Sequence, residues 1–185
     1  SRARLAAWVK DKSVVDVYSY IGGWGIQAAA FGATQVCCVD SSVQALEGVE
    51  ANARLNGVAA RVTTRRGSAP ELMAAMHGEG SRFDVVILDP PAFIQRKKDL
   101  KKGIAAYRRI NELGLQLLQL GGLLVSASCS MHLSRAELIA AMQQAAVRTG
   151  CQIRVVEQGA QGPDHPVHPA IPETEYLKAV FARKL

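Results

Sequence analysis

Short, almost entirely apolar runs recur along this chain, and the segments between them return an apolar residue about once per helical turn. The runs with the length and composition of strands are residues 13–17, 35–39, 61–64, 84–88, 122–127, 152–157 and 176–182. Several are apolar at successive positions, which is typical of strands covered on both faces. Regular alternation of strands and helices predicts the α/β class, with a mostly parallel sheet and helices on both faces.

Helical spacing is clearest in three of the intervening segments. It links Val43, Leu46, Val49 and Ala53, and likewise Ile110, Leu113, Leu117 and Leu120. Ser134-Arg135-Ala136-Glu137 has the sequence of a capping box, which predicts that a helix begins there. Six glycines and prolines between Gly159 and Pro172 predict a long loop before the last strand, and loops of this length are often functional.

A length of 185 residues, 49% of them apolar, suits one domain with one core, spanning residues 1–185. No apolar run approaches the roughly 18–20 residues of a membrane span, and the polar opening Ser1-Arg2-Ala3-Arg4 is not a signal peptide. Because the first residue is Ser and not Met, we expect that an upstream domain is missing. We expect a cytoplasmic protein without a membrane partner.

The four cysteines are Cys37, Cys38, Cys129 and Cys151, and none forms a CxxC pair. A zinc site is therefore not expected, nor any other metal site. Cys37 and Cys38 are adjacent in an apolar strand and are typical of reduced core residues. That pattern agrees with a reducing compartment such as the cytoplasm.

The net charge of +6 is concentrated in one segment. Residues 96–109 contain seven basic residues and one acid, Asp99, which gives +6 (7 − 1), and the rest of the chain balances at 15 against 15. The basic residues are Arg96, Lys97, Lys98, Lys101, Lys102, Arg108 and Arg109. A charge run is often only a solvated face. This one carries the whole net charge, which favours contacts with nucleic-acid phosphates.

Four polar elements each follow a predicted strand. They are the glycine-containing segment 16–25, Asp40, Asp89-Pro90-Pro91 and Ser128-Cys129-Ser130. In open α/β sheets, ligands bind beyond the carboxyl ends of the strands. Strand–helix alternation places all four elements on that edge, so the candidate site lies there.

The segment 16–25 and Asp40 predict a nucleotide-like ligand. Gly22 and Gly23 let the backbone approach a ligand closely, although a bare strand–helix turn explains them equally well. The segment lacks the GxGxxG of a dinucleotide site, which argues against a nicotinamide dehydrogenase. Asp40 can accept hydrogen bonds from both hydroxyls of a ribose. Alternatively, it is an acid that stabilises a helix N-terminus.

The two prolines after Asp89 hold the chain extended and remove two N–H donors. The Asp89 carboxylate can then accept from a planar ring such as a nucleobase. Phe93 either stacks on that ring or belongs to the core. Cys129 is either a nucleophile, which requires a lowered pKa, or a small buried residue at a strand end. His165, in the Pro-rich loop, can line the site.

These residues resemble a known family. Over nearly its whole length the chain resembles the class I S-adenosylmethionine (SAM) dependent methyltransferases. More narrowly, it is similar to the bacterial RlmI type, which methylates C5 of a cytosine in large-subunit ribosomal RNA. The matching stretches are Tyr18-Ser19-Tyr20-Ile21-Gly22-Gly23, Val39-Asp40, Phe83-Asp84-Val85-Val86, Asp89-Pro90-Pro91-Ala92-Phe93, Ser128-Cys129-Ser130, Asp164-His165-Pro166-Val167 and Tyr176-Leu177-Lys178.

The resemblance implies a Rossmann-like sheet of seven strands with the last antiparallel, and S-adenosylhomocysteine as a product. The cofactor residues implied are Tyr18, Ser19, Tyr20, Gly22, Gly23, Asp40, Ser41, Ser68 and Asp89. Many relatives place an acid after the third strand to hold the adenine amino group. This chain has Ser68 there, which accepts more weakly. Such enzymes usually carry an N-terminal PUA domain that binds RNA and a small linking domain, both absent from these 185 residues.

The resemblance also implies a mechanism. Cys129 would attack C6 of the cytosine while Asp89 bonds to N3 and the exocyclic amine. Ribosomal RNA would contact Pro90, Pro91, Phe93, His165 and the seven basic residues of segment 96–109. The base that removes the C5 proton is not identified and can be a water. Two alternatives stay open: an exocyclic-amine N-methyltransferase on RNA or DNA with a structural Cys129, and a non-catalytic module that binds SAM or RNA.

Overall fold

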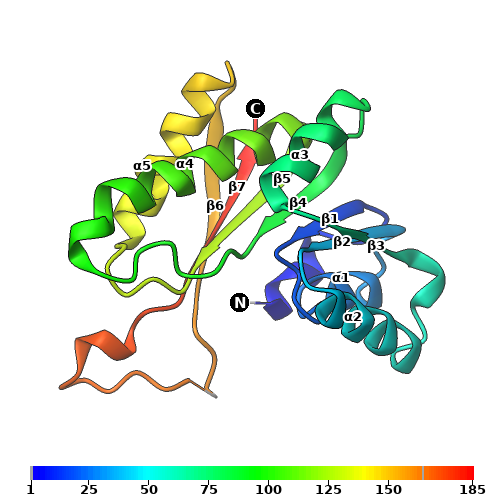
Figure 1. The fold of residues 1–185 in the computed structure, drawn as a ribbon, viewed down its shortest axis with the longest axis horizontal. Coiled ribbons are helices and arrows are strands. Elements are labelled where there is room, and N and C mark those ends of the chain that lie inside the picture. The colour runs from blue at the N-terminus through cyan, green and yellow to red at the C-terminus, as the bar shows by residue number, and fades with distance from the viewer. Residues whose placement is uncertain (1, 164) are drawn as a thin grey trace.

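A seven-stranded sheet forms the middle layer of the protein (Figure 1). The structure is a computed structural model that describes residues 2–163 and 165–185. The strand order is β3-β2-β1-β4-β5-β7-β6. The strands are β1 (Ser13–Val17), β2 (Gln35–Asp40), β3 (Val62–Arg66), β4 (Phe83–Leu88), β5 (Leu118–Ser128), β6 (Ile153–Ala160) and β7 (Lys178–Lys184). β7 pairs antiparallel with β5 and β6 and the other pairs are parallel, which confirms the predicted fold class.

Helices cover both faces of this sheet (Figure 1). One face carries the 3-10 segment η1 (Arg2–Ala7) with α1 (Gly25–Ala30) and α2 (Val43–Leu55), and the other carries α3 (Ala69–Gly78), α4 (Leu100–Leu117) and α5 (Arg135–Arg148). Further 3-10 turns are η2 (Ala59–Arg61), η3 (Lys97–Asp99) and η4 (Pro172–Thr174). Val14 belongs to one apolar core and Val15 to the other, which explains why the strand runs are apolar throughout. No helix of the described part is both long and apolar enough to cross a membrane.

The strand order reverses between β1 and β4. From β1 the chain moves outward through β2 to β3, and it then returns to the other side of β1. Ligands of open α/β sheets bind in the crevice at such a reversal. The register pairs Val17 with both Val39 and Leu88, so the residues after these three lie side by side at the carboxyl ends of the strands. Those residues are Tyr18, Asp40 and Asp89.

Every predicted strand exists, but several predicted bounds were wrong. β3 begins at Val62 because Arg61 belongs to η2. β6 continues past the predicted end at 157 to Ala160, and β7 begins at Lys178 instead of 176. The predicted capping box at Ser134 is confirmed, since its hydroxyl accepts from the Glu137 amide at 3.1 Å and the Glu137 carboxylate accepts in return at 2.7 Å.

The helical spacing that extended to Leu120 was misleading. α4 ends at Leu117, and Leu120 lies in β5 with 80% of its surface exposed. The Lys184 ammonium donates to the carbonyl oxygens of Leu115 at 2.7 Å and Leu118 at 2.8 Å. The helix therefore ends where another strand supplies partners for its last carbonyls, a cause that spacing along the sequence does not show.

Candidate active site

The loop after β1 takes an unusual backbone course. Tyr18 (φ 64°) and Tyr20 (φ 50°) both lie in the left-handed region, which is uncommon for residues other than glycine. Gly22 also has a positive φ of 84°, and a Cβ there would meet Ile26 Cγ1 at 2.8 Å. Only glycine fits this turn into α1. Backbone strain of this kind clusters at ligand sites, so the loop is a candidate ligand cradle.

Two carboxylates hold this loop by accepting hydrogen bonds from backbone amides. Asp16 accepts from the Gly25 amide at 2.8 Å, and Asp40 accepts from the amides of Tyr20 at 2.9 Å and Ser42 at 3.0 Å. Burial raises the pKa of the fully buried Asp16 to about 7. Asp40 thus supports the start of α2, as its alternative interpretation predicts. Each of its oxygens still has room for a second hydrogen bond, because a carboxylate oxygen has two lone pairs.

A cavity of about 680 Å³ opens at this edge of the sheet, within the usual range for small-molecule sites. It brings together most of the predicted site residues, as their positions after the strands predict. Of these it is lined by Tyr18, Ser19, Tyr20, Gly23, Asp40, Ser41, Asp89, Pro90, Pro91 and Cys129. Arg2, Ile21, Trp24 and Leu177 also line it, and they were not predicted.

Apart from the basic segment, four predicted site residues do not line this cavity, and one of them is Gly22 in the turn into α1. Ser68 is exposed at the start of α3 and does not line the cavity. Phe93 is half-buried, with its ring 6.3 Å from that of Tyr18 and 5.0 Å from that of Tyr107, so it packs on the core as its alternative interpretation predicts. His165 lines a second cavity of about 460 Å³, which borders the first at Asp89.

Asp89 lies where the two cavities meet. Its Oδ2 accepts from the indole N–H of Trp24 at 2.7 Å, and Trp24 also lines both cavities. Burial raises the pKa of Asp89, although the Trp24 bond and the charge of Arg2 oppose this shift. Trp24 is not among the residues that the sequence predicts for the site. Its place in the loop directly after Gly23 is the signal that could have brought it to attention.

A buried tyrosine makes hydrogen bonds with the two serines that flank Cys129. The Tyr107 hydroxyl lies 2.8 Å from Ser128 Oγ and 3.1 Å from Ser130 Oγ, and Tyr107 is fully buried. Tyr107 lies within the basic segment of the sequence, where its neighbours do not indicate a buried role. Its spacing of three residues from the buried Ile110 could have placed it on the inner face of α4.

Cys129 itself is half-buried, and burial together with the negative charge of Asp89 raises the pKa of its thiol. The lowered pKa of an activated thiol is therefore not present in this structure. The positive charge of Lys178 acts in the opposite sense and lowers it. The Lys178 ammonium donates to the carbonyl oxygens of Ser130 at 2.7 Å and Leu133 at 2.6 Å.

The cavity fits the polar cofactor that the sequence implies. Ser19 lines it and is only 5% exposed, and its hydroxyl has no hydrogen-bond partner within the described chain. A buried hydroxyl without a partner is costly, so a polar ligand would relieve it. Asp40, with acceptor capacity left, suits ribose hydroxyls. The residues present therefore fit SAM at the loop and at Asp40, while Ser68 does not reach the cavity.

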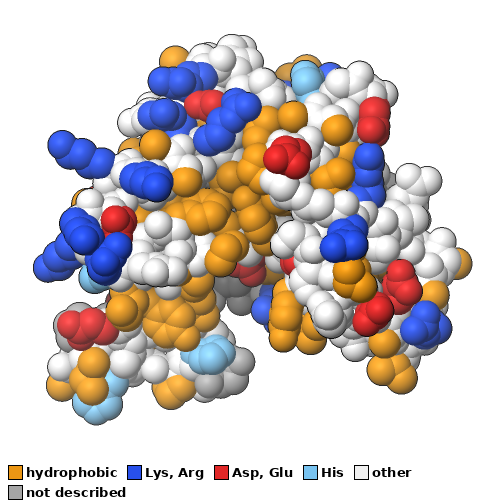
Figure 2. Space-filling model, viewed as in Figure 1, with side chains coloured by type: hydrophobic (Ala, Val, Ile, Leu, Met, Phe, Trp, Pro, Cys, Tyr) orange, Lys and Arg blue, Asp and Glu red, His pale blue; other side chains and the backbone are white. Residues whose placement is uncertain are grey.

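Basic side chains gather outside the cavity. Lys97 and Lys98 in η3 and Lys101 and Lys102 in α4 are all exposed, and Figure 2 shows Lys and Arg side chains grouped over this side of the molecule. Arg96 pairs with Asp99 at 3.1 Å. Four lysines of the predicted segment thus lie on the surface where a polyanion can reach them.

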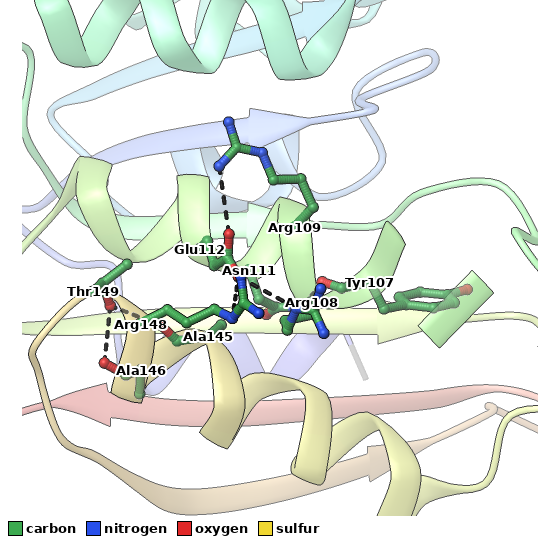
Figure 3. A network of polar contacts seen from close by, with 9 residues as sticks. All are labelled: Tyr107, Arg108, Arg109, Asn111, Glu112, Ala145, Ala146, Arg148 and Thr149. Atoms are coloured by element: carbon green, nitrogen blue, oxygen red, sulfur yellow. Dashed lines mark hydrogen bonds and ion pairs between the residues drawn. The ribbon is translucent and has the colours of Figure 1, made fainter. Parts of the chain in front are cut away.

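The remaining arginines of the segment converge on Glu112. Arg108 and Arg109 each approach its carboxylate at 3.4 Å, and Arg148 of α5 approaches it at 3.5 Å (Figure 3). One carboxylate is thus shared by three guanidinium groups, which leaves an excess of positive charge. Arg148 could not be predicted from the sequence, because only the packing of α5 on α4 brings it to this cluster.

Comparisons with known proteins agree with this geometry. The sequence profile of the family described as Conserved hypothetical protein 95 matches residues 3–119. The chain is 35% identical over 184 residues to the Ribosomal RNA large subunit methyltransferase I of Enterobacter sp. (strain 638), which covers 99% of this chain and 46% of that protein. It is 38% identical over 182 residues to the Ribosomal RNA large subunit methyltransferase of Deinococcus radiodurans, covering 98% and 44%. The chain spans about half the length of the curated relatives it matches.

Solved structures share the fold. SMU.776, a putative methyltransferase complexed with SAH, superposes with a TM-score of 0.85 at 18% identity, covering 98% of this chain and 48% of that one. TrmN from Thermus thermophilus superposes with a TM-score of 0.69 at 20% identity, covering 100% and 47%. The chain belongs to the family described as Conserved hypothetical protein 95, and it is a class I SAM methyltransferase domain related to ribosomal RNA large subunit methyltransferase I.

Proposed function

We propose that this domain methylates C5 of a cytosine in ribosomal RNA. The observation that carries the proposal is that Cys129 and Asp89 line the same cavity as the strained loop and Asp40. SAM bound there would supply a methyl group on a sulfonium centre. The names of the curated relatives support ribosomal RNA as the substrate.

The main difficulty of this reaction is that C5 of cytosine is a poor nucleophile, and Cys129 would overcome it. A bond from its thiolate sulfur to C6 makes C5 enamine-like and able to take the methyl group. The C5 proton then leaves to solvent, and the sulfur–C6 bond breaks to restore the ring and the thiolate. Cys129 therefore ends the cycle in the state in which it began.

Asp89 is suited to hold the base during this sequence. Addition at C6 moves negative charge toward N3 of the ring. Because burial raises the pKa of Asp89, the carboxyl group can share a proton with N3 as that charge develops. Trp24 holds Oδ2 and leaves Oδ1 for the base.

The cations of α4 favour RNA over a small substrate. Lys101 and Lys102 recur as Arg108 and Arg109 after seven residues, which places the pairs on one face of α4 about 10.5 Å apart. The buried face of the same helix carries Tyr107, which supports the Cys129 turn. Phosphates that follow α4 would therefore lead toward the cavity.

One observation favours a second function. The raised pKa of Cys129 is unfavourable for a thiolate and irrelevant to an exocyclic-amine N-methyltransferase. In that case Asp89-Pro90-Pro91 would hold the amino group of a base in RNA or DNA, and Cys129 would be structural. The two functions give different products.

Covalent trapping tests the proposal. We expect the protein with SAM to form an adduct, stable in denaturing gels, on a large-subunit ribosomal RNA transcript made with 5-fluorocytidine, because fluorine cannot leave as a proton does. Cys129→Ala should form none, keep SAM affinity within about twofold and lose methylation by several orders of magnitude. Cys151→Ala, a half-buried cysteine outside the cavity, is the matched control. An N-methylated nucleoside by mass spectrometry, without an adduct, would establish the second function instead.

A further inference from the structure

Lys178 is a buried cation directly behind the Cys129 turn. It begins β7, it is 7% exposed, and it pairs with Ser128 across the β5–β7 register. Its ammonium donates to two carbonyl oxygens of the turn at residues 128–133, at 2.7 Å from Ser130 and 2.6 Å from Leu133. The two bonds tie the turn after β5 to the first residue of β7.

The positive charge of this side chain needs an explanation beyond those bonds. Burial lowers the pKa of Lys178, which reflects the cost of placing an ammonium there. The charged groups that face it from α5 are Arg135, which adds to that cost, and Glu137, which reduces it. Neutral donors could satisfy two carbonyls at a lower cost. The remaining charged interaction of Lys178 is with Cys129, whose thiolate form it favours.

We propose that Lys178 is a positioning residue for Cys129: its ammonium fixes the turn at 128–133 and sets a positive charge beside the thiol. The inference rests on the proposed function, which gives Cys129 a reaction to perform. Among the described residues, Asp89 and Tyr107 also interact with the thiol. Burial and Asp89 both favour the neutral thiol, and Lys178 favours the thiolate that adds to C6. Lys178 keeps its proton throughout.

The same strand provides an internal control. At the other end of β7, the Lys184 ammonium also donates to two carbonyl oxygens, Leu115 at 2.7 Å and Leu118 at 2.8 Å. Lys184 is not among the groups that shift the pKa of Cys129, because it lies at the opposite edge of the sheet. Lys184 therefore makes the same kind of hydrogen bonds as Lys178 but does not act on the thiol of Cys129.

The pH dependence of Cys129 alkylation by iodoacetamide, followed on its peptide by mass spectrometry, tests the inference without RNA. Lys178→Met removes charge and donors, Lys178→Gln keeps donors without charge, and Lys178→Arg keeps both. We expect the titration midpoint of Cys129 to rise by about half a unit or more in the Met and Gln variants. Lys178→Arg and Lys184→Met should leave it in place. Equal midpoints in wild type and Lys178→Gln would overturn the inference, and this pair decides the question even if Lys178→Met fails to fold.

Trapping on the 5-fluorocytidine transcript gives a second measurement. Lys178→Gln should slow adduct formation by the factor by which its thiolate fraction falls, and Lys178→Arg should restore the rate. No adduct with wild type would count against the proposed function. An adduct rate in Lys178→Gln equal to wild type would count against Lys178 alone, so the two failures are distinguishable.

Discussion

The two edges of the sheet at which the parallel strands begin and end carry the same kinds of residue in different environments. At the start of β4, Asp84 accepts from both the amide and the hydroxyl of Ser13 at 2.9 Å and lies 4.0 Å from Lys12. Just after the end of β4, Asp89 is buried, accepts one hydrogen bond from Trp24, and has a raised pKa. The bonds of Asp84 to Ser13 join the starts of β1 and β4 and stabilise the fold. An acid buried beside a cavity with acceptor capacity left is available to a ligand.

β7 repeats the contrast with a cation. Lys184 closes the end of α4 at one edge, and Lys178 holds the Cys129 turn at the other. Because β7 runs antiparallel to β5, its first residue reaches the edge where β5 ends. Asp89 and Lys178 therefore both lie at the carboxyl edge, which is the edge that carries the cavity.

The largest expected effect separates Asp89 from Asp84. Asp89→Asn keeps an acceptor for Trp24 but cannot share a proton with the base, so methylation should fall by about 10²–10³ with the fold intact. Asp84→Asn weakens the bonds to Ser13 and should lower the free energy of unfolding by about 1–3 kcal/mol while the rate constant stays unchanged. Single-turnover methylation and urea denaturation measure the two effects. Equal loss of activity in both variants would show that the edges do not differ in function.

A smaller effect is expected at Asp40. Two hydrogen bonds from a ribose to a carboxylate are worth roughly 1.5–3 kcal/mol each before compensation, so Asp40→Ala should weaken SAM binding at least about tenfold. The variant also frees the amides of Tyr20 and Ser42, which loosens the loop. Glu47→Ala, an exposed acid on α2, is the control. Calorimetry that finds wild-type affinity in Asp40→Ala would remove Asp40 from the cofactor site.

Asp16 makes the stability of the carboxyl edge depend on pH. Its pKa is raised from 3.8 to about 7 in the folded chain, so folding favours the protonated acid. The stability from this group is present below about pH 4 and is lost as the pH rises through about 7. Asp16→Asn removes that pH dependence, so its stability relative to wild type should be higher at pH 8 than at pH 5. Urea denaturation at the two pH values checks this, and a constant difference would contradict the raised pKa.

The edge that carries the site could be predicted from the sequence because it follows from strand alternation alone. Asp40, Asp89 and Cys129 each come at or directly after the end of a strand, and parallel strands end at one edge. The cavity that they line has the place that this argument predicts. Their chemical roles stay predictions, since position does not establish reaction.

The contacts that tune these residues could not be predicted. Trp24 meets Asp89, and Lys178 meets the Cys129 turn, only because strands far apart in sequence pair in one register. Periodicity reports which face a residue occupies and not which side chain faces it. For the same reason Phe93 was predicted near the site without the ring packing that turns it to Tyr107.

The smallest expected effect concerns the basic surface. The sequence predicts phosphate contacts for the segment 96–109, and the structure adds Arg148 to these cations. Neutralising Lys97, Lys98, Lys101 and Lys102 should flatten the salt dependence of RNA binding by about 0.7 in log–log slope for each phosphate that the protein no longer neutralises. Arg148→Gln should free at most one phosphate, because its guanidinium is partly engaged with Glu112. Arg54→Gln, an exposed cation on α2 across the sheet, should leave the slope unchanged. Fluorescence anisotropy with a ribosomal RNA fragment at several salt concentrations gives these slopes. If Arg148→Gln and Arg54→Gln give the wild-type slope while the lysine variant does not, RNA follows α4 alone. If the lysine variant also keeps the wild-type slope, the basic segment is a solvated surface.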